Sequence, residues 1–391
     1  MDYIPRAMEP ELRRALEHFP ALLLTGPRRA GKTTLLRHAF PHASYHLVED
    51  PDVVGRVRAD PRSFLAGIRL PAILDEIQNV PEILNYVRAR IDADPEHAGQ
   101  WLLTASHEAA LMGGVTESMA GRAAVFQLQP LSVRETAEVS LLRGGFPEVL
   151  AHREVARICF ASYVQTYLER DVRGLSAIRD LATFRRFLAV LASRIGQILN
   201  KTDLAAPLGV SVPTVACWLS ILEVTGQILL LPPFYESFGK RLIKSPKVYF
   251  LDSGLACHLL GIEGPQSLAS SPFLGGLFEG YAAAEIVKQQ INAGRRREVY
   301  YFRDQQGLEV DFVVPAANHR LLLIEAKAGQ TVTPAAAQSL LRLSRAVERY
   351  DVARYAVHQP PPALRPVTAL CPGVSAVAVE DLLNRMAAGS A

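Results

Sequence analysis

Short apolar runs alternate with stretches of helical periodicity over the first third of the chain. Each run is bounded by polar or turn-forming residues and has the length of a buried strand. Strands are therefore predicted at 21–24, 43–47, 71–76, 100–104 and 124–128. Because strands separated by helices need crossover connections, this pattern predicts a parallel sheet with flanking helices.

The middle of the chain is mainly helical by the same criterion. Apolar residues recur at helical spacing between 154 and 198, namely Ile158, Ala161, Val164 and Leu168, then Phe184, Phe187, Leu188 and Leu191. Between 202 and 219 the pattern predicts two short helices that meet at Gly209, the second capped by Ser211. This arrangement is typical of a helix-turn-helix. Apolar runs at 226–234 and 247–251 are predicted to form the two strands of a wing.

A third unit starts near Pro272 and mixes both patterns. A helix is predicted at 277–291 and another at 334–347, with strands at 299–303, 308–314 and 321–326 and strand-like segments near 355–357 and 374–379. We therefore expect an α/β multidomain protein: a parallel sheet with flanking helices at 1–140, a helical winged-helix domain at 141–265 and a second α/β domain at 266–391.

Composition narrows the function classes only slightly. The formal charge of +3 and the pI of about 8.6 neither require nor exclude a nucleic-acid partner. The four cysteines lie far apart without a CxxC pair, so we expect reduced thiols rather than disulfides or zinc. The N-terminus lacks the apolar core of a signal peptide, and no apolar run reaches the length of a membrane span. These features predict a cytoplasmic protein that does not contact a membrane.

The first strand leads into a phosphate-binding motif. The segment Gly26-Pro27-Arg28-Arg29-Ala30-Gly31-Lys32-Thr33-Thr34 contains the pattern GxxxxGK[ST], and a helical stretch follows it. Successive backbone N–H groups and the helix dipole then stabilise a triphosphate. Lys32 is predicted to contact the β- and γ-phosphates of ATP, and Thr33 to bind Mg²⁺. The side chains of Arg28 and Arg29 are expected to point outward, towards substrate, a neighbour or solvent.

Acidic and polar residues follow the next strands. Asp75 and Glu76 end the run at 71–76; we expect Asp75 to hold Mg²⁺ through water and Glu76 to orient or deprotonate the attacking water. Ser106, like Thr104, could sense the γ-phosphate or simply cap a strand end. Arg122 follows a turn and is predicted to be either an arginine finger or an ordinary surface arginine.

Several of these motifs occur together in one known group of proteins. GPRRAGKTT, ILDEIQNVPE, WLLTAS, MAGR, QLQPLS and GGFPE, followed by TYLERDV, KVYFLDSG, EVDF and IEAK, resemble a large prokaryotic group of AAA-type P-loop ATPases with a C-terminal domain of unknown function. The resemblance covers nearly the whole chain and implies an intracellular protein that binds and hydrolyses ATP. Relatives read Thr-Gly-Ser where this chain has 104–106. The module lacks a full helical lid, so assembly into a homo-oligomer stays open.

One feature of the middle unit points to DNA as a partner, and one counts against it. The predicted recognition helix carries no Lys or Arg, but the segment 238–247 contains Lys240, Arg241, Lys244 and Lys247, as a wing on a DNA backbone would. An ordinary solvated hairpin, or a winged helix used for packing or self-association, is the alternative.

The last third resembles the restriction-endonuclease-like PD-(D/E)xK fold. Asp311 is on one predicted strand, and Glu325 and Lys327 are on one face of the next. Asp311 and Glu325 are expected to bind Mg²⁺, and Lys327 to stabilise charge on the attacked phosphate. Glu279 is the first choice for a further carboxylate ligand and Glu285 the second. A degenerate nuclease fold that only binds DNA is the main competitor.

Three functions are compatible with these patterns. The first is an ATP-driven enzyme that acts on DNA, and the second is a nucleotide switch in which ATP occupancy controls a partner while hydrolysis is slow. A metabolic kinase ranks last because no acceptor-substrate domain is evident.

Overall fold

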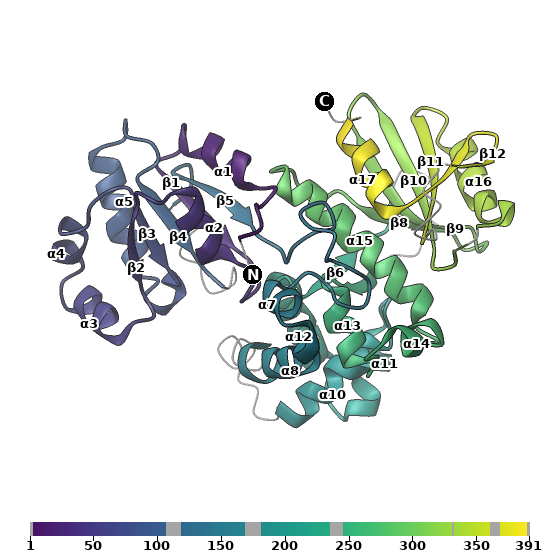
Figure 1. The fold of residues 1–391 in the computed structure, drawn as a ribbon, viewed down its shortest axis with the longest axis horizontal. Helices are drawn as coiled ribbons and strands as arrows, with labels where there is room; N and C mark the ends of the chain where they lie inside the picture. The colour runs from purple at the N-terminus through teal and green to yellow at the C-terminus, as the bar shows by residue number, and fades with distance from the viewer. Residues whose placement is uncertain are drawn as a thin grey trace.

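The computed structural model describes residues 3–106, 119–168, 181–234, 245–330, 332–359 and 368–388. Figure 1 shows a sheet with its helices on one side of the molecule, a second sheet on the other side, and a group of helices below and between them. Most of the predicted wing tip, including Lys240, Arg241 and Lys244, lies outside the described residues.

The N-terminal sheet has five parallel strands in the order β2-β3-β4-β1-β5. They are β1 (Ala21–Thr25), β2 (Ser44–Leu47), β3 (Ala72–Asp75), β4 (Trp101–Thr104) and β5 (Ala123–Gln127). All five match the predicted segments. Because β4 lies between β1 and β3, polar residues at its carboxyl end lie between the P-loop and the acidic residues that follow β3.

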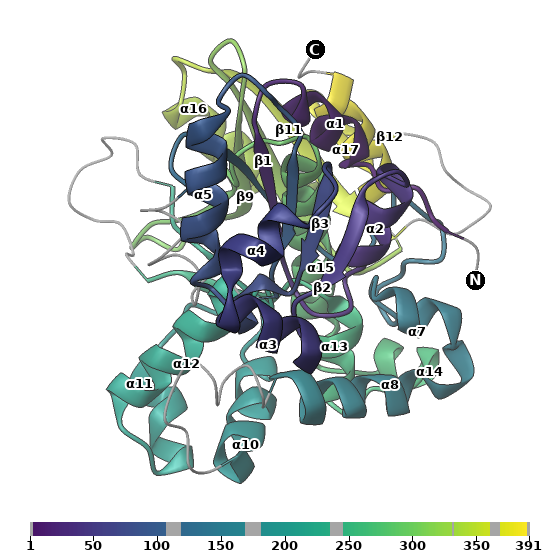
Figure 2. The same ribbon diagram turned by 90° about the vertical axis from the view of Figure 1, so that its left-hand side faces the viewer.

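Helices cover both faces of this sheet, which explains why its strands are apolar at successive positions. Leu22 and Leu24 pack on one side with α1 (Glu9–Leu16) and α2 (Lys32–Ala39). Leu23 packs on the other side, which is covered by the remaining helices of this unit: α3 (Pro51–Ala59), α4 (Pro61–Ala66), η1 (Ile77–Asn79) and α5 (Ile83–Ala93). Figure 2 shows α2 and α5 on opposite sides of the sheet.

The middle of the chain contains short helices and one antiparallel strand pair. The elements are α7 (Pro147–Ala151), η2 (Arg153–Val155), α8 (Ala156–Tyr163), η3 (Val164–Leu168), α10 (Leu181–Ala192), α11 (Lys201–Ala205), η4 (Ala206–Leu208), α12 (Val212–Val224), β6 (Ile228–Leu231), β7 (Lys247–Phe250), α13 (Ser253–Leu259) and α14 (Pro265–Ala269). Gly209 has φ 66°, and the Ser211 hydroxyl accepts a hydrogen bond from the Thr214 N–H at 3.2 Å. The predicted helix pair and its cap are therefore confirmed.

The bend between these two helices is sharp. The segment Lys201–Leu208 and the helix Val212–Val224 meet at 110°. Within the described ranges, no single helix is long and apolar enough to cross a membrane, although this bent pair meets the criteria of length and composition.

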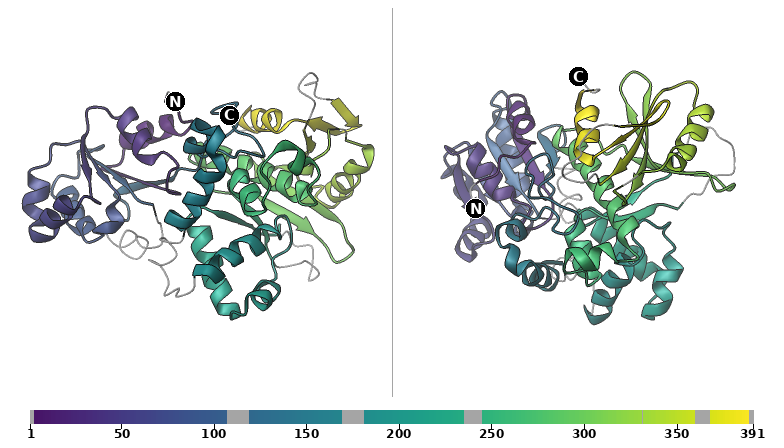
Figure 3. Two further views of the ribbon diagram at one scale, coloured as in Figure 1. Left: turned by 60° about the horizontal axis from the view of Figure 1, so that its bottom comes forward. Right: turned by 45° about the vertical axis from the view of Figure 1, so that its right-hand side comes forward.

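The C-terminal sheet is mixed, with the order β12-β13-β11-β10-β9-β8. Its elements are α15 (Leu274–Asn292), β8 (Tyr300–Arg303), β9 (Glu309–Ala316), β10 (Arg320–Lys327), η5 (Pro334–Ala337), α16 (Gln338–Ala346), β11 (Asp351–His358), β12 (Thr368–Cys371), β13 (Val374–Val377) and α17 (Val379–Ala388). Helices α15 and α17 pack on one face and α16 on the other, and the right-hand view of Figure 3 shows α16 and α17 on opposite sides of the sheet.

Helix α15 belongs to the cores of both the middle and the C-terminal units. It packs against β7 and α13 on one side and β10 and α17 on another. Tyr249, Phe278 and Phe312 are fully buried in one continuous cluster that joins the two units. Strand β7 is thereby fixed against the C-terminal sheet.

Candidate functional site

The loop between β1 and α2 has the shape that the phosphate-binding motif requires. Gly26 has φ 133°, and a Cβ atom there would lie 2.1 Å from the carbonyl oxygen of Leu128. Gly31, with φ 97°, precedes the first residue of α2. Because a side chain is strained or blocked at both positions, only glycine lets the loop wrap back toward the helix N-terminus.

Lys32 is directed into this loop. Its ammonium group donates hydrogen bonds to the carbonyl oxygens of Gly26 at 2.9 Å and Pro27 at 3.0 Å, and the residue is 4% exposed. The loop is also supported from outside by Arg6, which donates to the carbonyl oxygen of Ala30 at 2.8 Å. Sequence reasoning missed Arg6, because a single arginine near the N-terminus carries no recognisable signal.

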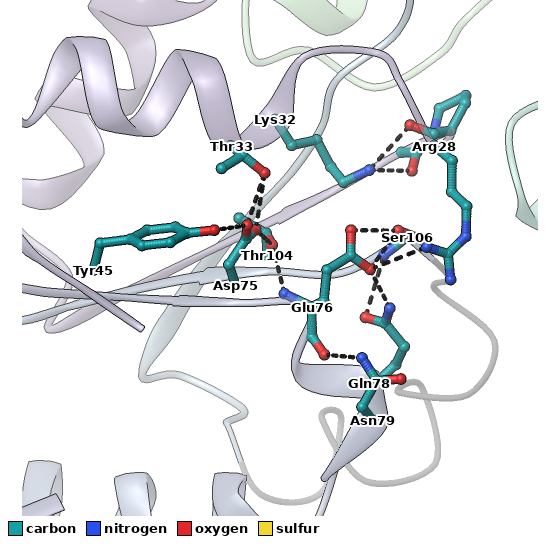
Figure 4. A network of polar contacts seen from close by, with 12 residues as sticks. Arg28, Lys32, Thr33, Tyr45, Asp75, Glu76, Gln78, Asn79, Thr104 and Ser106 are labelled. Carbon is teal, nitrogen blue, oxygen red and sulfur yellow. Dashed lines mark hydrogen bonds and ion pairs between the residues drawn. The ribbon is translucent and has the colours of Figure 1, made fainter. Parts of the chain in front are cut away.

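Asp75 is at the centre of a hydroxyl cluster beside the loop. Its carboxylate accepts hydrogen bonds from Thr33 Oγ1 at 3.1 and 2.8 Å, from the Tyr45 hydroxyl at 2.8 Å and from the Thr104 hydroxyl (Figure 4). Burial, followed by the hydrogen bond to Asp75, raises the pKa of Tyr45. A carboxylate and a threonine hydroxyl are oxygen ligands that suit Mg²⁺, so these residues fit the predicted ion.

Glu76 lies beside the same loop in a left-handed backbone conformation, with φ 61°. Its carboxylate accepts hydrogen bonds from Ser106 Oγ at 2.9 and 2.7 Å and from the Gln78 amide (Figure 4). Burial acts to raise the pKa of Glu76, but the charge of Lys32 and the hydrogen bond from Ser106 outweigh it and lower the pKa. Glu76 is therefore a carboxylate at neutral pH, as a water-activating base must be.

The two arginines of the loop differ. Of the three directions considered for Arg28, solvent is ruled out: the residue is 9% exposed, lines the pocket at Lys32, and its guanidinium lies 3.6 Å from the Glu76 carboxylate. A buried carboxylate draws the cation inward. The Arg29 side chain is 52% exposed and lies 3.6 Å from Glu148 of α7, so it does face outward, toward the middle unit.

Arg122 is not brought to this site. It precedes β5 at the amino ends of the parallel strands, whereas the P-loop, Asp75 and Glu76 follow the carboxyl ends. Its side chain forms a 2.5 Å ion pair with Asp92 and is 33% exposed. Within this chain, Arg122 is thus a surface arginine, the second of the two roles considered from the sequence.

Two adjoining pockets open at the loop. One of about 390 Å³ is lined by Arg28, Lys32, Thr33 and Glu76. The other, of about 530 Å³, is lined by Tyr3, Ile4, Arg6, Leu131, Ala151 and His152. Arg29, Gly31, Thr34, Pro147 and Glu148 line both pockets. The first has the polar groups that a triphosphate needs, and the second is apolar enough for a base.

The rim of these pockets is positioned by two sequence motifs that meet in space. A Cβ atom on Gly144 would lie 2.1 Å from the Asp252 carboxylate, and the Gly145 N–H donates to that carboxylate at 2.7 Å. Asp252 also accepts from the Leu255 N–H at 2.9 Å at the start of α13. Pairing GGFPE with LDSG in this way places Pro147 at the mouth of the pocket, a contact that the sequence alone did not reveal.

The acidic residues of the C-terminal unit converge at a second place. The ammonium group of Lys247, on β7, lies 2.8 Å from Glu279, 2.7 Å from Glu309 and 3.6 Å from Asp311. Beside them, Lys327 forms a 2.7 Å ion pair with Glu325, which confirms that these two residues share a face of β10.

The structure distinguishes the two glutamates of α15. Glu279 reaches this acidic cluster, whereas Glu285 is buried on another side of the helix, where it pairs with Lys288 at 2.8 Å and accepts from the Val133 N–H at 2.8 Å. In the parts of the chain that the structure describes, no three His, Cys, Asp or Glu side chains are arranged to hold a metal ion. Glu279, Asp311 and Glu325 do not fit the predicted Mg²⁺, because an ammonium group lies among the carboxylates.

Comparisons with known proteins divide the chain into three parts. Residues 18–137 match the family described as AAA domain, residues 134–266 match a domain of unknown function (DUF8612), and residues 274–361 match another (DUF4143). Two proteins described as uncharacterized, Rv2008c of Mycobacterium tuberculosis and Mb2031c of Mycobacterium bovis, are each 35% identical over 312 residues. The match covers 78% of this chain and 69% of each of theirs.

Solved structures show weaker likenesses. A Walker-type ATPase of Pyrococcus abyssi is 16% identical with a TM-score of 0.45, over 66% of this chain and 96% of that one. The Orc1 protein of Aeropyrum pernix, solved in complex with DNA, is 16% identical with a TM-score of 0.27, over 70% of this chain and 95% of that one. These likenesses are too weak to carry an argument about function.

Proposed function

Since this chain belongs to the same family as Rv2008c and Mb2031c and carries an AAA domain, it is a P-loop ATPase of the AAA type, and we propose a specific site and mechanism for it. ATP binds with its phosphates in the pocket at Lys32 and its base in the adjoining pocket near Ile4. The observation that carries this proposal is that Lys32, Thr33 and Glu76 line one pocket, and that the Thr33 hydroxyl donates a hydrogen bond to the buried carboxylate of Asp75.

The residues of the loop bind the phosphates. In the structure Lys32 bonds to carbonyl oxygens of its own loop, and a γ-phosphate offers it a charged acceptor instead. Thr33 and Asp75 would hold Mg²⁺, which neutralises charge on the β- and γ-phosphate oxygens. Tyr45 and Thr104 orient the Asp75 carboxylate by donating hydrogen bonds to it.

Glu76 orients the attacking water and accepts its proton. Ser106 and Gln78 fix the direction of its carboxylate through hydrogen bonds. Arg28 is close enough to stabilise the negative charge that spreads over the transferring phosphoryl group. Arg28, Lys32, Thr33 and Glu76 already line the pocket that would hold the phosphates.

The partner that we propose is DNA, contacted through a winged helix formed by α11, α12 and the β6–β7 pair. The 110° bend and the antiparallel strands that follow it support this proposal. The exposed residues of α12 (Val212, Pro213, Cys217 and Ser220) include no cation, so phosphate contacts fall to residues outside that helix.

A nucleotide switch is the second candidate, and the Arg29–Glu148 ion pair favours it. This pair links the phosphate-binding loop to the middle unit, so ATP occupancy can be sensed there whether or not turnover is fast. In that case the partner is controlled by binding, and DNA does not accelerate hydrolysis.

ATP turnover with and without duplex DNA separates these functions. Lys32→Ala should abolish turnover, whereas Lys201→Ala, at an exposed lysine of α11, should leave DNA-free turnover unchanged. Stimulation by DNA that weakens steeply with salt supports the DNA-acting enzyme. Binding of ATP without such stimulation supports the switch, and turnover that survives Lys32→Ala would show that the site is misplaced.

A further inference from the structure

The acidic cluster of the C-terminal sheet contains a cation that comes from a different unit of the chain. Glu279 lies on α15 and Glu309 and Asp311 on β9, whereas Lys247 is the first residue of β7. We infer that Lys247 is the resident cation of this cluster, occupying the place of a divalent metal ion and fastening the β6–β7 pair to the C-terminal sheet.

Lys247 and a metal ion exclude each other by distance. The Lys247 ammonium lies 2.8 Å from Glu279 Oε1 and 2.7 Å from Glu309 Oε1. A divalent ion bound to the same oxygens would lie about 2.0–2.6 Å from them, which is nearly the same point in space. The carboxylates of Glu279 and Glu309 can therefore bind the Lys247 ammonium or a metal ion, but not both at once.

The charges around the cluster are nearly balanced without a metal. Four carboxylates (Glu279, Glu309, Asp311 and Glu325) meet three cations (Lys247, Arg303 and Lys327) through ion pairs. Burial acts to lower the pKa of Lys247, but the charges of Glu279, Asp311 and Glu309 outweigh it and raise the pKa, so the amine stays protonated. A buried carboxylate group without Lys247 would need another cation.

Strand β7 is held so that Lys247 cannot simply swing away. Its side chain is 2% exposed, and Tyr249, two residues along the same strand, donates a hydrogen bond to Glu279. Tyr301 of β8 receives a hydrogen bond from the Phe234 N–H at 2.7 Å, and its hydroxyl donates to the carbonyl oxygen of Ser245 at 2.5 Å. Phe234 and Ser245, the described residues that precede and follow 235–244, are therefore both hydrogen-bonded to Tyr301 of the C-terminal sheet.

Mn²⁺ binding to the full chain without nucleotide tests this inference, with the stoichiometry measured by electron paramagnetic resonance. Lys247→Met keeps the length of the side chain but removes its charge. We expect the wild-type chain and Asp311→Asn to bind the same number of Mn²⁺ ions, and Lys247→Met to bind one more. The extra ion should be lost in the double variant Lys247→Met/Asp311→Asn, and Mn²⁺ should raise the melting temperature of Lys247→Met by more than that of the wild-type chain.

Lys288→Met is the matched control. Lys288 is also a buried lysine, but it pairs with Glu285 at another side of α15, so its loss should destabilise the chain without creating a Mn²⁺ site. The inference is overturned if wild-type chain binds one more ion than Asp311→Asn, a comparison that holds even where Lys247→Met does not fold. It is also overturned if a folded Lys247→Met gains no ion.

Discussion

Arg28, within the phosphate-binding loop, lies 3.6 Å from Glu76, the residue proposed to activate water. The two side chains are 10% and 15% exposed, so their charges interact with little screening by water. A γ-phosphate arriving in the same pocket competes with Glu76 for Arg28. Under the proposed mechanism, ATP binding would therefore free the Glu76 carboxylate to act on the attacking water.

Arg28→Ala should lower kcat for ATP hydrolysis by about 10²- to 10³-fold, because the transition state loses a buried positive charge. Steady-state turnover measures the effect. Arg29→Ala is the control, since Arg29 faces Glu148 at the rim and its loss should change kcat far less. If kcat fell equally in the two variants, the proposal that Arg28 stabilises the transition state would be wrong.

Thr33→Ala should raise the Mg²⁺ concentration needed for half-maximal turnover, because it removes a hydroxyl that touches Asp75. Titration of turnover with Mg²⁺ at fixed ATP measures the shift. Tyr45→Phe loses only one hydrogen bond to the Asp75 carboxylate, worth about 1 kcal/mol, and should shift the curve less because Thr33 remains. An unchanged Mg²⁺ requirement in Thr33→Ala would argue against this ion site.

The acid limb that Glu76 gives the pH profile of kcat should lie below the range in which an ordinary glutamate titrates, because Lys32 and Ser106 lower its pKa. The base works when deprotonated, so activity is present above this pKa and lost as the pH falls through it. Ser106→Ala removes a hydrogen bond that favours the charged form, which raises the pKa and moves the limb to higher pH. Ser193→Ala, in the middle unit, should leave the profile unmoved.

Arg6→Met should destabilise the N-terminal unit by about 3–5 kcal/mol, because it leaves Glu135 buried without its partner. Burial acts to raise the pKa of Glu135, but Arg6 outweighs it and the pKa is lowered. The pair therefore stabilises the fold above the usual carboxyl pKa and less as the pH falls below it. Urea denaturation measures the loss, and Arg13→Ala, at a half-exposed pair with Glu9, should cost under about 1 kcal/mol.

Patterns of residues close together in the sequence predicted many elements of this structure. The five parallel strands, the glycines of the phosphate loop and the Ser211 cap each depend on neighbours within a few residues, and all were predicted. Alternation along one strand likewise placed Glu325 beside Lys327. Strand β12 and helix α17 were missed, because the strand is short and the helix directly follows an apolar strand that masks its start.

Contacts between residues far apart in the chain could not be predicted from the sequence. The direction of Arg28 depends on Glu76, 48 positions away, and that of Lys247 on Glu279. The cluster of basic residues at 238–247 suggested that Lys247 lies on a wing or a solvated hairpin. Only the packing of α15 against β7 brings its side chain among carboxylates. The middle and C-terminal units also had to be seen together before the shared cluster could be recognised.

The helix that serves two cores has a mechanical consequence. Since α15 packs against β7 and α13 as well as β10, the middle unit and the C-terminal sheet form one continuously packed arm. The end of that arm nearest the phosphates is formed by Pro147 and Glu148 at the pocket rim. If this arm rotated about the pocket rim, β12, which lies at the far end of the molecule from the N-terminal sheet in Figure 1, would move further than the residues at the rim.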